Sequence, residues 1–113
     1  INELCKYVEK FDGMGVRFVR SCPYFLELLP EGVSKGSALE NMCKADSLAS
    51  LVKGRKVISA GDYENDIEML KASDISFCPA NSQPEVKRAS DYVLNSSCDE
   101  DAIAEALEAL LKL

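Results

Sequence analysis

A strand-to-helix turn in the middle of the chain carries the side chains best suited to chemistry. The apolar run Lys56–Ala60 ends at Gly61 and is followed by Asp62, Asn65 and Asp66. A run of this kind is typical of a strand buried on both faces of a parallel sheet, and ligands bind beyond the carboxyl ends of such strands. Asp62 offers the oxygen ligands that Mg²⁺ prefers, and Asn65 adds a donor at a helix start, where anions bind. Taken alone, the same residues also suit a helix cap.

A lysine upstream adds a positive charge to this pattern. Lys35 opens a helical segment that continues through Cys43. The helix dipole disfavours a cation at that end, whereas a bound phosphate and nearby carboxylates would stabilise one. The alternative is a lysine exposed in a loop.

Several stretches of the chain together resemble one family. They are Ser34–Leu39, Gly61–Leu70, Pro79–Ser82 and Val86–Val93. In order and spacing they resemble the carboxyl-terminal part of haloacid dehalogenase superfamily hydrolases, in the Cof-like branch of phosphatases. The resemblance runs from about Glu31 to the end of the chain.

The resemblance implies a role for each residue of the motif. Lys35 matches a catalytic lysine that contacts the transferred phosphoryl group, and Asn65 matches an asparagine that binds the phosphate. Asp62 matches an acidic metal ligand, and Asp66 matches a second acid that supports Lys35 or the metal. The implied activity is Mg²⁺-dependent hydrolysis of small phosphorylated metabolites, such as sugar phosphates, through an aspartyl-phosphate intermediate.

The family's nucleophile, the first aspartate of an Asp-x-Asp motif after an apolar strand, is not found in this chain. The one such string, Asp99–Asp101, follows polar residues and suits a capping or solvated turn. Two loops also depart from the family pattern, at Pro79–Ser82 and Asp99–Ala102. We therefore expect a fragment that is inactive alone. A non-catalytic α/β binding or assembly module is the alternative, while a nucleotide-binding domain lacks support because no P-loop string is present.

The resemblance and the periodicity together predict an α/β fold with two parts. Residues 1–30 resemble the carboxyl-terminal remnant of an α+β cap domain, and residues 31–113 the carboxyl-terminal half of a hydrolase core, a partial Rossmann-like parallel sheet with flanking helices. The cap residues Arg17, Tyr24 and Phe25 suit either a substrate-facing surface or ordinary sheet packing. The elements expected are a helix ending near residue 12, strands 16–21 and 24–29, a helix from Lys35, strand 56–60, a helix at 64–72, strand 75–78, a helix from Pro84, strand 92–94 and a last helix whose apolar positions pack in the core.

The missing half has a physical consequence for the strand Lys56–Ala60. In the family, the strand with the nucleophile pairs beside it, so here an apolar edge is left unpaired. Exposed edges of this kind promote association. We expect the chain either to self-associate through this edge or to require the absent half of the core.

The composition argues against several other kinds of partner and site. The chain has 13 basic and 19 acidic residues, a net charge of −6, and no concentrated basic surface, so we expect no nucleic-acid partner. No apolar run approaches the roughly 20 residues that span a bilayer, which argues against a membrane partner. Five scattered cysteines and no histidine indicate reduced thiols in a cytoplasmic protein, without a zinc site or a His-activated nucleophile.

Overall fold

The computed structural model describes residues 1–113, and its centre is a three-stranded parallel sheet. The strands are β3 (Ile58–Ala60), β4 (Ile75–Cys78) and β5 (Tyr92–Val93), in the order β3-β4-β5. Ser59 of β3 lies opposite Ser76 of β4, and Phe77 lies opposite Tyr92 of β5. Each strand follows a helical connection, as βαβ units require. The predicted α/β fold with a parallel sheet and flanking helices is therefore confirmed.

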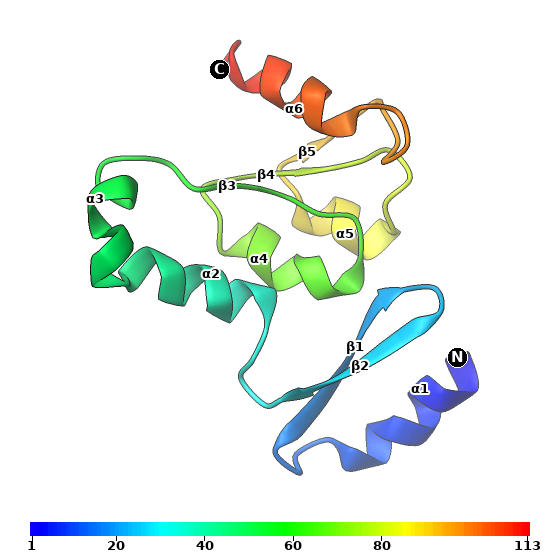
Figure 1. The fold of residues 1–113 in the computed structure, drawn as a ribbon. Coiled ribbons are helices and arrows are strands. Elements are labelled where there is room, and N and C mark those ends of the chain that lie inside the picture. Colours follow the sequence, from blue (N-terminus) through cyan, green and yellow to red (C-terminus); the bar gives the residue numbers. More distant parts are fainter.

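Helices cover the two faces of this sheet (Figure 1). The helix α6 (Ala102–Leu110) lies on one face, while α4 (Ile67–Lys71) and α5 (Pro84–Ala89) lie on the other. The long helix α2 (Lys35–Lys44) packs against α4 from outside. Short helical turns complete this part: η2 (Asp46–Leu48), α3 (Ala49–Val52) and η3 (Glu64–Asp66).

The core is concentrated on the central strand, β4. Phe77 is buried on the α6 side with Leu94, Ala102 and Ala106. Cys78 points the other way and is buried with Leu70 of α4 and Val86 of α5. Successive residues of a strand face opposite sides, so β4 alone joins the two apolar clusters.

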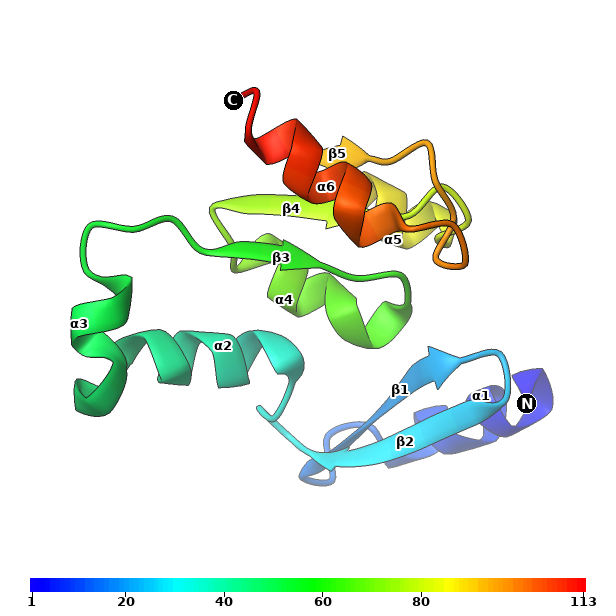
Figure 2. The same ribbon diagram turned by 45° about the horizontal axis from the view of Figure 1, so that its top comes forward.

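Residues 1–30 form a small α+β layer beside this core. They comprise α1 (Asn2–Val8), the turn η1 (Glu9–Phe11) and an antiparallel hairpin of β1 (Val16–Cys22) and β2 (Phe25–Pro30). Figure 2 shows the helix lying against one side of the hairpin. All of these elements were predicted within one or two residues. Their assignment as the remnant of a separate cap domain stays a prediction.

Two expectations about burial were wrong. The strand expected over residues 56–60 is shorter, and it is not buried on both faces, because Ile58 is 45% exposed. Its outer edge has no strand beside it, which was the expectation for that edge. The apolar positions of α6 were expected to pack in the core. Ala106 does so, but Ile103, Leu107 and Leu111 are exposed because no element lies over that side of the helix.

No helix in the structure combines the length and the apolar character needed to cross a membrane.

Candidate functional site

The turn after β3 is closed by a carboxylate from the next helical turn. Oδ2 of Asp66 accepts hydrogen bonds from the backbone N–H groups of Asp62, at 3.0 Å, and Tyr63, at 3.4 Å. A Cβ atom on Gly61 would lie only 2.4 Å from the Cβ of Asp66. Glycine at position 61 is therefore required by the close approach of Asp66, and the turn depends on both residues.

Lys35 reaches this turn because two helices pack closely. Ser34 caps α2 by accepting a hydrogen bond from the N–H of Ser37 at 3.0 Å. Two residues further, a Cβ on Gly36 would lie 2.7 Å from the backbone carbon of Glu68 in α4, so only glycine allows this approach. The Nζ of Lys35 then lies 2.5 Å from Oδ1 of Asp66.

The Lys35–Asp66 ion pair explains why a lysine is tolerated at the start of α2. The carboxylate of Asp66 offsets the cost of a cation at a helix start. Asp66 is 7% exposed at its side chain, whereas Lys35 is 51% exposed. Both carboxylate oxygens of Asp66 are already hydrogen-bonded, but the Lys35 amine keeps one side open to solvent.

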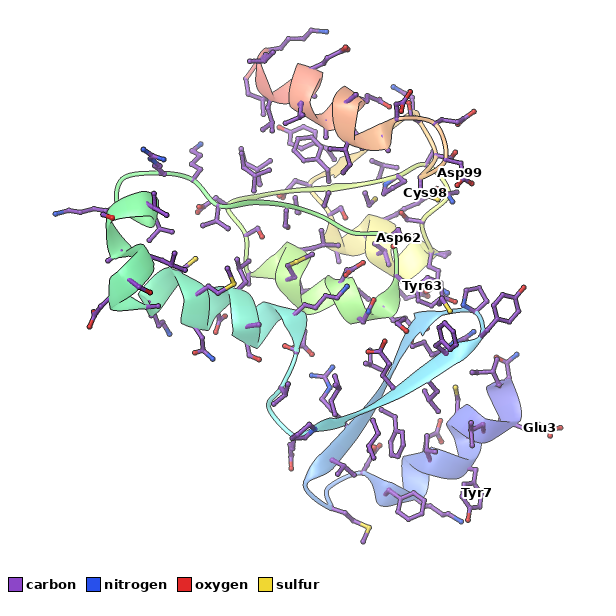
Figure 3. The ribbon with its side chains drawn as sticks, viewed as in Figure 1. Glu3, Tyr7, Asp62, Tyr63, Cys98 and Asp99 are labelled. Atoms are coloured by element: carbon purple, nitrogen blue, oxygen red, sulfur yellow. The ribbon has the colours of Figure 1, made fainter.

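Asp62 has the opposite surroundings. Its side chain is exposed and its carboxylate accepts no hydrogen bond from the protein. Figure 3 shows Asp62 and Tyr63 on the loop that leaves the sheet, with Cys98 and Asp99 on the neighbouring loop. Asp62 therefore offers a free carboxylate at the carboxyl end of β3, where a ligand can reach it.

A cavity of about 630 Å³ joins these residues. Lys35, Gly61, Asp62 and Asp66 line one side of it. The opposite side is lined by Pro79 and by the loop before α6, with Cys98, Asp99 and Asp101. The cavity is thus lined by one lysine and four aspartates, which together carry a net charge of −3.

The structure separates Asn65 from this cavity. Asn65 lies on η3 with the other motif residues, but it does not line the cavity and makes no side-chain hydrogen bond. Its predicted role in phosphate binding stays a prediction. Lys35, Asp62 and Asp66 are brought together, although they come from segments up to 31 residues apart.

Asp99 and Asp101 were not predicted to belong to the site. They form the exposed acidic turn that the sequence indicated, yet both line the cavity. No local pattern in the sequence indicated this position, which follows from a contact between two loops. Asn81 accepts a hydrogen bond from the Cys98 N–H at 2.9 Å and donates one to the Cys98 Sγ at 3.1 Å. The loop Pro79–Ser82 is therefore bonded to Cys98, the residue directly before the loop Asp99–Ala102.

Glu105, in the first turn of α6, holds the loop that lines this side of the cavity. Its carboxylate accepts hydrogen bonds from the N–H of Asn95, at 2.8 Å, and of Ser96, at 2.7 Å. These bonds lower the pKa of Glu105 to about 2. The loop before α6 is thus attached to the helix by an ionised glutamate.

The acidic side chains of the cavity can be compared with the ligands that the predicted Mg²⁺ needs. The structure has no group of three or more acidic, cysteine or histidine side chains arranged to hold an ion. The free carboxylate of Asp62 still fits Mg²⁺, which is commonly held by one or two carboxylates together with water and substrate phosphate. The engaged oxygens of Asp66 fit that role less well and suit the support of Lys35.

A second ion pair connects the hairpin to the core. Nη1 of Arg17 on β1 lies 2.5 Å from Oε1 of Glu68 on α4. Hydrogen bonding to Ser34, and then the Arg17 guanidinium, lower the pKa of Glu68 more than its burial raises it. Arg17, for which the sequence left open a substrate-facing surface or ordinary sheet packing, contacts Glu68 of the core in this structure.

Comparison with known proteins gives matches across most of the chain. The model of a family described as haloacid dehalogenase-like hydrolase matches residues 1–107. A Mycoplasma pneumoniae protein provisionally named a phosphatase is 37% identical over 105 residues, which cover 93% of this chain and 34% of that protein. The phosphoglycolate phosphatase of Archaeoglobus fulgidus is 33% identical over 110 residues, covering 97% of this chain and 45% of its own.

Among solved structures, a Plasmodium vivax protein provisionally described as a haloacid dehalogenase, Cof-like hydrolase shares the fold. It has a TM-score of 0.80 and 24% identity, and the match covers 97% of this chain and 37% of that one. The chain spans from about a third to just under half the length of the curated relatives it matches.

Proposed function

Because the chain belongs to the haloacid dehalogenase-like hydrolase family, we propose that it supplies the lysine and metal-binding half of a Mg²⁺-dependent phosphatase. The observation that carries the proposal is the Lys35–Asp66 ion pair beside the free carboxylate of Asp62, inside one cavity. A cation and a free carboxylate at the end of a parallel strand suit a phosphate and its metal. The proposed substrates are small phosphorylated metabolites, such as sugar phosphates.

Each residue has a separate part in this proposal. The Lys35 amine would bind the phosphoryl oxygens and stabilise the charge that develops on them during transfer. Asp66 would hold that amine in place and keep the turn around Gly61 closed. Asp62 would hold Mg²⁺, which when bound offsets the negative charge of the phosphate and of the nucleophile.

The nucleophile of the proposed reaction is not among these residues. In the full-length protein, an aspartate from outside the 113 residues would form the aspartyl-phosphate intermediate. We accordingly propose that the chain alone releases no phosphate from its substrates. A chain that hydrolyses phosphate monoesters by itself would contradict this part of the proposal.

The test uses the full-length protein and a set of phosphorylated metabolites with Mg²⁺. We expect Asp62→Asn to lower kcat/KM by about 10² to 10³, the size of effect seen when one stabilising group is removed from an active site. Lys35→Ala should produce a loss of similar size. Glu64→Gln, two residues after Asp62 in η3 and outside this cavity, is the matched control and should retain activity.

The outcome separates the enzyme from a non-catalytic module. Phosphate release that depends on Mg²⁺, Lys35 and Asp62 supports a phosphatase. Full activity in Asp62→Asn would contradict the proposed role of that residue. A full-length protein that hydrolyses none of the tested compounds would favour the module that keeps the fold for binding or assembly.

A further inference from the structure

Glu68 of α4 lies against both sides of the connection between the hairpin and the core. This connection covers residues 31–34, and Figure 1 shows it running from the end of β2 to the start of α2. On the hairpin side, Oε1 of Glu68 lies 2.5 Å from Nη1 of Arg17. On the core side, Glu68 lines a cavity of about 320 Å³ together with Ser34 and Gly36. One side chain of α4 is therefore placed between two elements that the chain joins only by a short connection.

Ser34 links Glu68 to the backbone of α2. Ser34 is buried, and its hydroxyl oxygen accepts a hydrogen bond from the N–H of Ser37 at 3.0 Å. A hydroxyl group also has one proton to donate. The Glu68 carboxylate accepts this second hydrogen bond, which is the main cause of the lowered pKa of Glu68, ahead of the Arg17 guanidinium. Ser34 thus caps α2 and is itself held from α4.

The two helices are in close contact at the same point. A Cβ on Gly36 would lie 2.7 Å from both the Cβ and the backbone carbon of Glu68. Interiors packed this closely transmit small displacements. The first turn of α2 therefore rests directly on the residue that bears the carboxylate, and a shift of Glu68 is a shift of this turn.

Lys35 is the first residue of that turn, between Ser34 and Gly36. Its amine lies 2.5 Å from the Asp66 carboxylate. Asp66 thus holds the far end of the lysine side chain, whereas Glu68 holds the backbone from which the side chain starts. A group that stabilises a transition state must be held within a fraction of an ångström, so both ends matter for its effect.

We propose that Glu68 is a positioning residue for Lys35, and that Arg17 of the hairpin holds Glu68 in place. The hairpin is thereby coupled to the proposed phosphate-binding lysine through Arg17, Glu68 and Ser34. Glu68 does not line the cavity that contains Lys35 and Asp62, so it acts through Lys35 and touches no substrate. The proposal rests on the phosphatase function proposed above, because that function gives Lys35 its task.

Kinetics of the full-length protein with Mg²⁺ and p-nitrophenyl phosphate test the proposal. Glu68→Ala should lower kcat/KM by about tenfold, less than the loss expected for Lys35→Ala. Glu68→Gln keeps an oxygen acceptor for Ser34 and Arg17 and should restore kcat/KM to within about threefold of the parent. Glu40→Ala is the matched control. Glu40 lines the same cavity as Glu68 but belongs to none of the ion pairs, so its loss should change kcat/KM by less than about twofold.

Double-mutant cycles separate positioning from a general loss of structure. Because Glu68 acts through Lys35, Glu68→Ala should change kcat/KM by less than about twofold in a Lys35→Ala background. Arg17→Met should cost about threefold in the parent and less than about 1.5-fold beside Glu68→Ala. Full additivity in either cycle would overturn the proposal, as would an unchanged kcat/KM in Glu68→Ala.

Amide hydrogen exchange of the full-length protein gives a readout that does not need activity. The Ser37 N–H donates to Ser34, so it should exchange about fivefold faster in Glu68→Ala and at the parent rate in Glu40→Ala. A protein that hydrolyses no phosphate monoester would contradict the proposed function, and the exchange of Ser37 then decides alone whether Glu68 holds α2. Unchanged exchange in Glu68→Ala would overturn the positioning role whatever the activity.

Discussion

Asp62 and Asp66 are four residues apart on one turn, yet their surroundings are opposite. Asp66 is buried, and its two oxygens accept from Lys35 and from two backbone N–H groups. Asp62 is exposed and its carboxylate accepts nothing from the protein. The difference teaches that one aspartate organises the site while the other is available to a ligand. Stability should therefore depend on Asp66, and ligand binding on Asp62.

The largest expected difference in stability is between variants that lack the Asp66 carboxylate and variants that lack the Asp62 carboxylate. Asp66→Ala leaves two backbone N–H groups and a lysine without their acceptor. We expect a loss of about 2 to 3 kcal/mol in the free energy of unfolding, a range that already allows for the weaker contribution of the half-exposed Lys35. Asp62→Ala should change it by less than about 0.5 kcal/mol. Urea denaturation of both variants measures the contrast. Equal losses would show that the two aspartates do not differ as described.

A substitution at Gly61 tests the role of Asp66, because the Asp66 side chain lies directly against position 61. Gly61→Ala places a methyl group against the Asp66 side chain, so we expect a loss of about 1 to 3 kcal/mol in the free energy of unfolding. The same substitution in an Asp66→Gly background meets no side chain and should cost less than about 0.5 kcal/mol. A double-mutant cycle by urea denaturation gives the coupling. Additive losses would contradict a steric cause.

The Arg17–Glu68 pair should contribute less than the Lys35–Asp66 pair, because both of its side chains are substantially exposed. We expect Arg17→Met to cost about 0.5 kcal/mol, reduced further by salt. The pKa of Glu68 is lowered on folding, so its contribution is present above pH 4.5 and is lost as the pH falls below that value. Thermal melts from pH 7 to pH 3 compare Arg17→Met with the parent chain. A difference that persists at pH 3 would assign the effect to packing.

The smallest effect is expected at the wall of the cavity opposite Asp62. Hydrogen bonds lower the pKa of Glu105 to about 2, so its stabilising contribution is complete above pH 4.5 and is lost as the pH falls toward 2. An NMR titration of the Glu105 carboxyl carbon should show a midpoint well below that of an ordinary glutamate. Glu105→Gln should remove this part of the pH dependence of stability. A normal midpoint would show that the loop is not held by Glu105 in solution.

Much of the site was predictable because it is local in the sequence. Gly61, Asp62 and Asp66 belong to one strand-to-helix turn, and a strand followed by acidic residues indicates a ligand position at a sheet edge. Asn65 belongs to the same motif but does not line the cavity, so its phosphate contact stays a prediction.

Burial was predicted less well, since it depends on what packs against an element. The repeat of apolar residues in α6 identified a helix but not which of its sides is covered, so Leu107 was expected in the core and is exposed. Ile58 was misjudged for the same reason. A pattern of apolar residues indicates a side of an element that a neighbouring element could bury, but it does not show that such a neighbour is present.

The sequence by itself determined the order of strands and helices, the turn at Gly61 and the identity of the residues that bear charge there, because these follow from local backbone preferences. Tertiary structure decided which charges meet. Lys35 reaches Asp66 because Gly36 lets α2 approach α4 at Glu68. Asp99 lines the same cavity as Asp62 on a loop that Asn81 and Glu105 hold in place. Contacts between distant segments depend on shape and packing, which no single stretch of sequence contains.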